Sequence, residues 1–224
     1  MITWTLCDNA DAVARTACTR IVRAARDAIF NRGRFVIVLA GGSTPELCYR
    51  LLAESTSNLR KWHIFFGDER CLPPTDPQRN SMLVAAALFD RVSIPEEQIH
   101  IIPAELGAEP AARSYAKRIS RATPFDMVLL GLGEDGHTAS LFPGHNHPER
   151  PLVVPVHTAP KPPADRVSMN YSTLSFSRQV MFMVTGENKQ NAVTGWRRGD
   201  LLPAARIGSL GGLEVLVDRA AWSG

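Results

Sequence analysis

The stretch FVIVLAGGSTP, residues 35–45, indicates the fold most directly. Residues 35–39 form a continuous apolar run rich in β-branched side chains, which is typical of a strand buried on both faces. Gly41 and Gly42 follow and let the backbone turn tightly, and Pro45 suits the first position of a helix. The stretch therefore predicts a buried strand that leads straight into a helix.

The same alternation continues on both sides of this stretch. Before it, an apolar stripe over residues 10–28 predicts a helix that Asp8 caps and Gly33 ends. Further strands are predicted at residues 64–66, 99–102, 125–130, 180–184 and 213–217, and further helices from Pro45, at 80–89, at 109–120 and from about 187. Strands that alternate with helices favour right-handed crossovers. We therefore predict an α/β fold, a doubly wound, mostly parallel sheet with helices on both faces.

Length and composition favour one domain over residues 1–224. The 45% hydrophobic content is enough for a buried core, and a single core can reach roughly 250–300 residues. The pattern loosens in the proline-rich stretch 143–163, but the chain after it is too short for a second domain. We find no internal repeat in the sequence.

The charge and the cysteines exclude several classes of protein. A net charge of +3 with scattered basic residues does not indicate a nucleic-acid-binding protein. No apolar run approaches the roughly 18 residues of a membrane helix, and the N-terminus does not resemble a signal peptide. The widely spaced cysteines do not suggest a disulfide framework, so reduced thiols are expected. We expect a soluble, cytoplasmic protein without nucleic-acid or membrane partners.

Two polar loops follow predicted strands, where ligands bind in parallel sheets. In the loop 41–45, free amides at a helix start and the hydroxyls of Ser43 and Thr44 would make an anion site; an ordinary strand-to-helix turn explains the loop equally well. The loop 67–70, GDER, places Asp68 and Arg70 where they could orient or polarise a polar substrate. A solvated ion pair is the commoner alternative for such a loop.

The loop 131–138, GLGEDGHT, is the most informative of the chain. Its glycines match the dinucleotide pattern G-x-G-x-x-G, but two carboxylates, Glu134 and Asp135, would lie beside the pyrophosphate. We instead interpret the glycines as room for His137, which Asp135, and Asp68 if it lies nearby, would hold as a general base. The alternative is a histidine with a structural hydrogen bond. His145 and His147 do not form a known metal-ligand spacing with it, so no metal is predicted.

Two cations in the C-terminal part are candidates for binding an anion. Arg166 could grip a phosphate bidentately, and Lys189, at a predicted helix start, could supply a point charge. Each alone is more typical of a surface charge. They would form a phosphate site only if they converge with the loop 41–45. No G-x-S-x-G motif supports a serine nucleophile.

Together these motifs resemble the 6-phosphogluconolactonase family in order and spacing. The resemblance rests on LAGGSTP (39–45), GDER (67–70), NSM (80–82), GLGEDGHTASLFPG (131–144), Arg166 and GENK (186–189). It covers nearly the whole chain from about residue 8, and the long histidine motif is its specific part. The resemblance implies a Rossmann-like fold, no cofactor, and hydrolysis of 6-phospho-D-glucono-1,5-lactone to 6-phosphogluconate in the oxidative pentose phosphate pathway.

The resemblance also implies roles for individual residues. His137 would activate water, Asp135 would orient it, and Arg70 would face the lactone. Asp68 matches the base of the related deaminases. The residues implied in substrate or phosphate binding are Gly41, Gly42, Ser43, Thr44, Thr138, Arg166 and Lys189. The chain departs from the family pattern at Glu134, where many relatives have proline, and in the His-Asn-His-Pro stretch after Gly144.

Two other functions are compatible with this kind of sequence. Glucosamine-6-phosphate deaminases have a histidine motif resembling GHIAFNEP, whose glutamate is replaced here by Phe142, and they tend to have tyrosine where Arg70 stands. A non-catalytic sugar-phosphate-binding regulator would usually carry an effector domain, for which this chain has no room. Both comparisons favour the lactonase. We expect it to act on a small-molecule lactone and to be a monomer, although the sequence alone leaves the oligomeric state open.

Overall fold

The computed structural model describes residues 2–55, 57–148 and 150–222, and its centre is a sheet of seven parallel strands in the order β1-β10-β9-β6-β2-β3-β5. The strands are β1 (Ile2–Cys7), β2 (Phe35–Leu39), β3 (Trp62–Phe66), β5 (Ile99–His100), β6 (Phe125–Leu130), β9 (Ser177–Val184) and β10 (Gly212–Asp218). In the middle of the sheet Val38 pairs with Phe65 on one side and with Val128 on the other.

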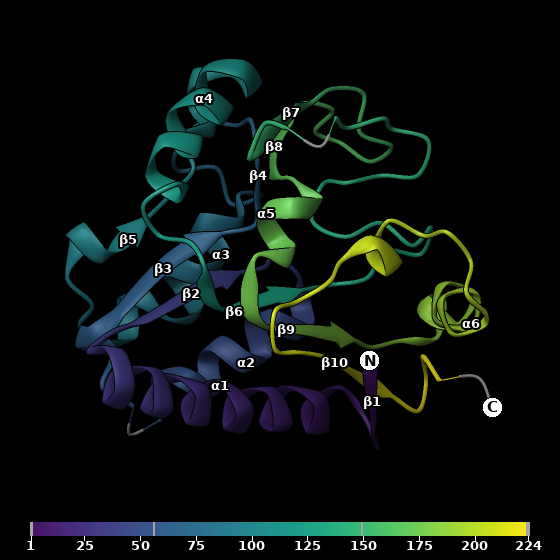
Figure 1. Ribbon diagram of the computed structural model, residues 1–224, viewed down its shortest axis with the longest axis horizontal. Helices are drawn as coiled ribbons and strands as arrows, with labels where there is room; N and C mark the ends of the chain where they lie inside the picture. The colour runs from purple at the N-terminus through teal and green to yellow at the C-terminus, as the bar shows by residue number, and fades with distance from the viewer. Residues whose placement is uncertain (1, 56, 149, 223–224) are drawn as a thin grey trace.

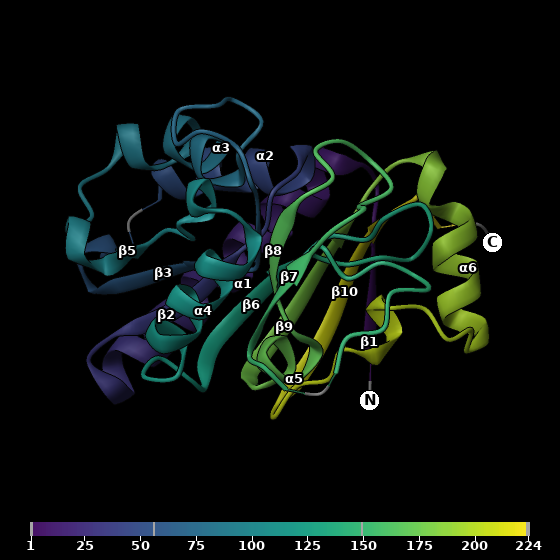
Figure 2. The ribbon, with the colours of Figure 1, turned by 90° about the horizontal axis from the view of Figure 1, so that it is seen from above.

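Helices cover both faces of this sheet (Figures 1 and 2). The long helix α1 (Ala10–Arg32) and α2 (Ser43–Ala53) lie on one face, while α4 (Ala108–Ile119), α5 (Tyr171–Ser175) and α6 (Gln190–Arg198) lie on the other. Helix α3 (Asn80–Ala87) packs beside α2. Short 3-10 turns are η1 (Leu59–Lys61), η2 (Phe89–Arg91), η3 (Glu96–Gln98), η4 (Ala104–Leu106), η5 (Glu187–Lys189) and η6 (Ala204–Arg206). The predicted doubly wound α/β fold is confirmed.

A second, antiparallel sheet lies on the α4 side of the first one (Figure 1). It consists of β4 (Asp68–Arg70), β8 (Arg166–Met169) and β7 (Val153–Val156), in that order. Its register places Arg70 opposite Arg166. The sequence pattern loosens over residues 143–163 and predicted no strand there, so β7 was missed. Pro155 hides this strand in the sequence, yet an edge strand tolerates proline because one side of it has no partner.

Helix α1 forms because its apolar residues recur at helical spacing and face the sheet. The buried positions are Val13, Ala14, Ala17, Ile21, Ala25 and Ala28. Its cap is Asn9, whose side chain accepts a hydrogen bond from the Ala12 amide at 2.9 Å, so the prediction of Asp8 as the cap is wrong by one residue. Gly33, with φ of 75°, ends the helix as predicted.

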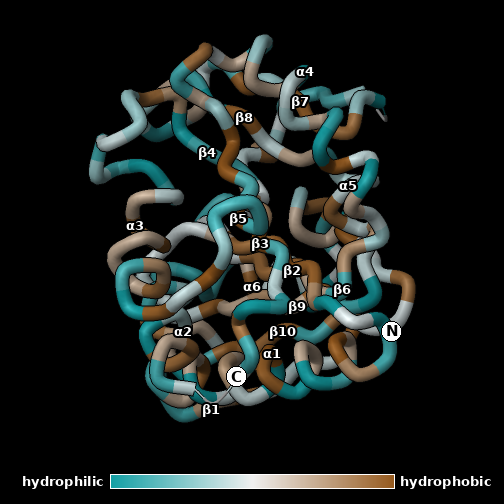
Figure 3. Tube along the Cα trace, turned by 90° about the vertical axis from the view of Figure 1, so that its left-hand side faces the viewer, coloured by the Kyte–Doolittle hydropathy of each residue, from teal (hydrophilic) through white to brown (hydrophobic). Residues whose placement is uncertain are grey.

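The main core lies between the parallel sheet and its two helical layers. Every residue of β2 and β6 is buried, and Figure 3 shows the hydrophobic stretches of β2 and β3 inside the molecule. Trp196 of α6 packs edge-on against Trp4 and Phe182, with ring centroids 5.3 and 4.8 Å apart. None of the helices in the described part of the chain combines the length and the apolarity that crossing a membrane requires.

Candidate active site

A cleft of about 540 Å³ opens beyond the carboxyl ends of β2, β3, β6 and β9. This is where ligands bind in parallel sheets. The loops after these strands and the turn before β8 line it. Of the predicted site residues, the cleft brings together Gly41, Gly42, Ser43, Thr44, Asp68, Arg70, His137, Arg166 and Lys189.

His137 is held by the carboxylate of Asp135, which lies behind it. Its Nδ1 is 2.5 Å from Asp135 Oδ1, and the same oxygen accepts the His137 backbone amide at 3.0 Å. Burial raises the pKa of Asp135, but these hydrogen bonds outweigh burial and lower it overall. An ionised Asp135 favours the tautomer with a proton on Nδ1, which leaves the Nε2 lone pair free to accept a proton.

The glycine at position 133 makes room for this histidine. A Cβ atom there would lie 2.0 Å from His137 Nδ1. On another side, the Phe142 ring packs against the imidazole, with centroids 4.6 Å apart. Within the described residues Nε2 has no hydrogen-bond partner, and the side chain is 23% exposed. The imidazole is therefore held in orientation while one nitrogen remains available to a ligand.

Asp68 also lines the cleft, but its hydrogen bonds go elsewhere than to His137. Its Oδ2 accepts the Ser140 hydroxyl at 2.6 Å, and its Oδ1 accepts the Asn80 side-chain amide at 3.1 Å. Asn80 in turn requires a glycine at position 41, because a Cβ there would lie 1.9 Å from Asn80 Oδ1. Ser140 and Asn80 position this carboxylate, and sequence reasoning assigned neither of them a role.

Glu69 connects the loop of Arg70 to helix α3. It is fully buried, and its carboxylate accepts the backbone amides of Arg70, Asn80 and Ser81 at 2.7–2.9 Å. Arg79, also buried, lies 3.6 Å away. The alternative of a solvated ion pair is therefore wrong for Glu69, whose charge stabilises the free amides at a helix start. The signal in the sequence was NSM (80–82), which only the fold brings next to this loop.

At the other end of the cleft, the start of α2 presents free amides. Gly42, with φ of 112°, precedes the helix, and Ser43 is its first residue. The prediction that Pro45 opens the helix is wrong by two residues, because the positive φ of Gly42 already turns the chain. Thr44 Oγ1 lies 2.5 Å from Thr185 Oγ1, so this loop is tied to the loop after β9.

The two predicted cations occupy different neighbourhoods of the cleft. Arg166 is 6% exposed, and its guanidinium donates to the carbonyls of Pro163 and Lys161 at 3.1 and 2.7 Å. Burial lowers the pKa of Arg166. The carboxylate of Asp68 raises this pKa, and the positive charge of Arg70 lowers it further. Burial likewise lowers the pKa of Lys189. The carboxylate of Glu134 raises this pKa, and the ammonium of Lys161 lowers it further. Arg166 is thus electrostatically coupled to Arg70 and Asp68, and Lys189 to the rim of the cleft.

Thr138, implied in substrate binding, does not line the cleft. Its side chain is 1% exposed, and its hydroxyl donates to the Gly131 carbonyl at 2.9 Å. It supports the loop 131–138 from behind.

Comparison with known proteins identifies the family. The model of the family described as glucosamine-6-phosphate isomerases/6-phosphogluconolactonase matches residues 8–216. The chain belongs to this family. It is 36% identical over 172 residues to the 6-phosphogluconolactonase of Rattus norvegicus, covering 71% of this chain and 67% of that protein. It is 34% identical over 197 residues to the 6-phosphogluconolactonase of Haemophilus influenzae, and the match covers 83% of this chain and 85% of that protein. The solved 6-phosphogluconolactonase of Thermotoga maritima superposes with a TM-score of 0.92 at 28% identity, covering 98% of this chain and all of that one.

One feature of the rim departs from what the resemblance to this family implies. Glu134 Oε1 accepts the Asn188 side-chain amide at 2.8 Å and lies 3.4 Å from Lys161 Nζ. These contacts bridge the histidine loop, the turn before β8 and the turn η5. Sequence reasoning noted the departure at Glu134 but not Asn188 or Lys161, which are far from it in the chain.

The histidines that follow the family's long motif do not gather into a metal site. His145 packs edge-on against Phe142, with centroids 5.6 Å apart, and its ring lies 6.1 Å from that of His147. Among residues 2–55, 57–148 and 150–222, no group of three His, Cys, Asp or Glu side chains could hold a metal ion.

Proposed function

We propose that this chain is a 6-phosphogluconolactonase that hydrolyses 6-phospho-D-glucono-1,5-lactone to 6-phosphogluconate, a step of the oxidative pentose phosphate pathway. The names of its relatives support the reaction class. The observation that carries the proposal is the His137–Asp135 pair, 2.5 Å apart, in the same cleft as the start of α2 and two partly buried cations.

In this proposal the anionic end of the substrate is bound first. Free amides and hydroxyls at the start of α2 suit a phosphate, as do the ammonium of Lys189 and the guanidinium of Arg166. A bound phosphate would place the lactone carbonyl near His137, and such positioning removes much of the entropic cost of the reaction.

The chemical step is addition of water to the lactone carbonyl. His137 Nε2 takes a proton from the water, whose oxygen bonds to the carbonyl carbon. The tetrahedral oxyanion then collapses, the bond to the ring oxygen breaks, and the proton held by His137 goes to that oxygen. The products are a hydroxyl and a carboxylic acid, which ionises. General-base help of this kind contributes about 10²- to 10⁴-fold, and we assign Arg70 to the oxyanion, where a fixed positive charge has most effect.

The remaining assignments are also proposals. Asp68, held by Ser140 and Asn80, would keep Arg70 and Arg166 in place through its charge. Thr138 would support the histidine loop. We also propose that the protein acts as a monomer. Cys7, Cys18, Cys48 and Cys71 are all unpaired, which favours a reducing compartment such as the cytoplasm.

A coupled assay with freshly generated lactone tests the proposal. We expect 6-phosphogluconate to form faster than by spontaneous ring opening, and this acceleration to disappear in His137→Ala. Ammonia release from glucosamine 6-phosphate would instead assign the chain to the deaminases. Absence of both activities, with sugar-phosphate binding retained, would indicate a regulator.

A further inference from the structure

A second hollow, of about 550 Å³, lies away from the cleft, at the amino ends of the strands. Its floor comes from β2, β3 and the edge strand β5, and its wall from the last turn of α4 and the turn that follows. Figure 1 shows where α4 lies relative to these three strands. Arg34, which lines it, directly precedes β2, whereas the cleft opens where β2 ends. The two sites therefore share no residue.

The hollow has an excess of positive charge that the protein does not neutralise. Its charged residues are the cations Arg34, Lys117, Arg118 and Arg121 and the single carboxylate Glu97. In the described part of the chain, none of these four cations forms an ion pair with a carboxylate. Such a group of unpaired cations around a concave surface attracts anions.

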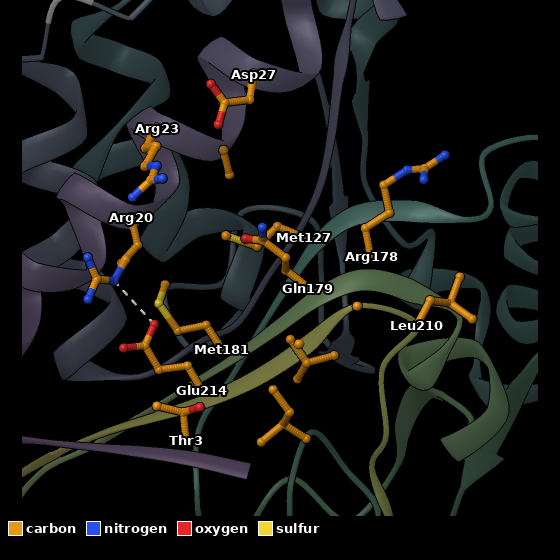
Figure 4. A pocket seen from close by; sticks show the side chains of 15 residues that line it. Thr3, Arg20, Arg23, Asp27, Met127, Arg178, Gln179, Met181, Leu210 and Glu214 are labelled. Atoms are coloured by element: carbon orange, nitrogen blue, oxygen red, sulfur yellow. Dashed lines mark hydrogen bonds and ion pairs between the residues drawn. The ribbon is translucent and has the colours of Figure 1, made fainter. Parts of the chain in front are cut away.

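Another hollow of the molecule shows the contrast. It measures about 800 Å³ and lies between α1 and the strands β6, β9 and β10 (Figure 4). There, Arg20 pairs with Glu214 at 3.3 Å, and Arg178 pairs with Asp126 at 3.5 Å. Only Arg23 of its three arginines lacks such a partner in the described part of the chain, and Asp27 and Glu214 also line this hollow, so it gives less reason to expect an anion.

Three aromatic side chains, His63, Phe65 and His100, line the cationic hollow. Phe65 and His100 pair across β3 and β5, and their rings stack with centroids 4.2 Å apart at 24°. The His63 ring lies nearly parallel to that of His100, at 8°, with centroids 6.0 Å apart. Burial and the neighbouring Arg34 lower the pKa of His63; burial, His63 and Arg118 lower that of His100 to about 4. Both imidazoles are thus neutral near pH 7, and such rings favour stacking with planar heterocycles.

We propose that this hollow binds a nucleoside diphosphate, with the base against His63 and His100 and the phosphates against the arginines. The aromatic side chains can contact a planar base, and the four cations are enough to bind more than one phosphate. Arginine suits phosphate because its guanidinium donates two parallel hydrogen bonds. The volume also lies within the roughly 300–1,000 Å³ of small-molecule sites. The proposal does not depend on the lactonase activity.

ADP, inorganic pyrophosphate and adenosine are the probes for a titration followed by calorimetry and by the histidine ring signals in NMR spectra. We expect one ADP per chain, shifts at His63 and His100, and affinity at least about tenfold above that of either fragment, since two favourable parts of a ligand add in free energy. Pyrophosphate binding as tightly as ADP, or no binding of ADP, would overturn the proposal.

Variants locate the site. Arg118→Ser with Arg121→Ser should weaken ADP binding about tenfold or more, as the loss of charge-assisted hydrogen bonds implies, while lactone hydrolysis and the melting temperature stay unchanged. Arg113→Ser, also exposed on α4 but outside the hollow, is the matched control and should leave ADP binding intact. His63→Ala tests the stacking separately. If Lys189→Ala abolished ADP binding and the double variant did not, ADP would be binding in the cleft and the proposal would be wrong.

Discussion

Asp135 Oδ1 lies 2.5 Å from His137 Nδ1 and also accepts the His137 amide, so one carboxylate orients both the ring and the backbone of the histidine. Asp135→Asn keeps the size of the side chain but removes its charge and permits the wrong imidazole tautomer. We expect kcat to fall by about 10²- to 10⁴-fold, the full range of general-base help, with an unchanged melting temperature. The coupled assay measures it, and full activity in this variant would contradict the assigned role.

Gly133 and Gly131 provide a matched pair of substitutions. In Gly133→Ala the new Cβ would lie 2.0 Å from His137 Nδ1, whereas a Cβ at Gly131 would have no atom of the described residues within 4 Å. We expect Gly133→Ala to displace the imidazole and to lower kcat by about tenfold or more, since misplacing a catalytic group is costly. Gly131→Ala should keep nearly full activity in the same assay. Equal losses in both variants would show that the loop, and not contact with the histidine, is responsible.

Glu69 is expected to be a strong determinant of stability. Its buried carboxylate accepts three backbone amides and lies beside the buried Arg79. Removing one partner of a buried pair costs about 3–5 kcal/mol, so Glu69→Ala should lower the free energy of unfolding by that amount in a urea titration. The control is Glu46→Ala, which breaks an exposed pair with Arg50 four residues away and should cost below about 0.5 kcal/mol. Similar effects of the two variants would refute this account.

His157 should make stability depend on pH. It lies between Asp165 (2.7 Å) and Glu109 (2.8 Å), and the hydrogen bonds with these carboxylates raise its pKa above the ordinary value of 6.5. A raised pKa in the folded state stabilises the fold fully below the unfolded value, and this is lost as pH rises through the folded value. The stability difference between the parent and His157→Gln should therefore be larger at pH 5.5 than at pH 8.5. A difference that grows with pH would contradict the expected direction.

Glu134 should weaken phosphate binding. Asn188 and Lys161 hold its carboxylate at the rim of the cleft. The negative charge of this carboxylate raises the pKa of Lys189, which burial lowers. Exposed charges of this kind contribute about 0–1 kcal/mol, so Glu134→Gln should lower KM by up to about fivefold and leave kcat unchanged. The effect should shrink at high salt. A higher KM would mean that the rim contacts order the site and that their loss outweighs the change in charge.

The fold could be predicted where buried elements have a recognisable hydrophobic pattern in the sequence. The strands β2 and β6 are buried on both faces and appear as continuous apolar runs. The edge strands β1 and β7 could not be recognised, because one side of each is unpaired and the sequence there tolerates polar residues or Pro155. Asp8 was predicted as the cap of α1 in place of Asn9, because the side chains of both residue types can accept a hydrogen bond from a free amide at a helix start.

The candidate site likewise contains residues that could be predicted from the sequence and others that could not. His137, Asp135 and Gly133 are neighbours in the chain, so their loop could be interpreted locally. The partners of Asp68 could not, since Ser140 is 72 residues away and joins it only through tertiary structure. Thr138 matches the motif in sequence, but its position behind the loop depends on the direction of its side chain, which the sequence does not reveal.

The register of the small sheet has a consequence for anion binding in the cleft. Arg70 and Arg166 are directly opposite each other on β4 and β8, and like charges so placed repel across a strand pair. At Arg166 the attraction of Asp68 exceeds the repulsion from Arg70, so this carboxylate holds the two cations together. An anion bound between the two guanidinium groups would add to the attraction of Asp68, so that occupancy of the cleft and the rigidity of this sheet should increase together.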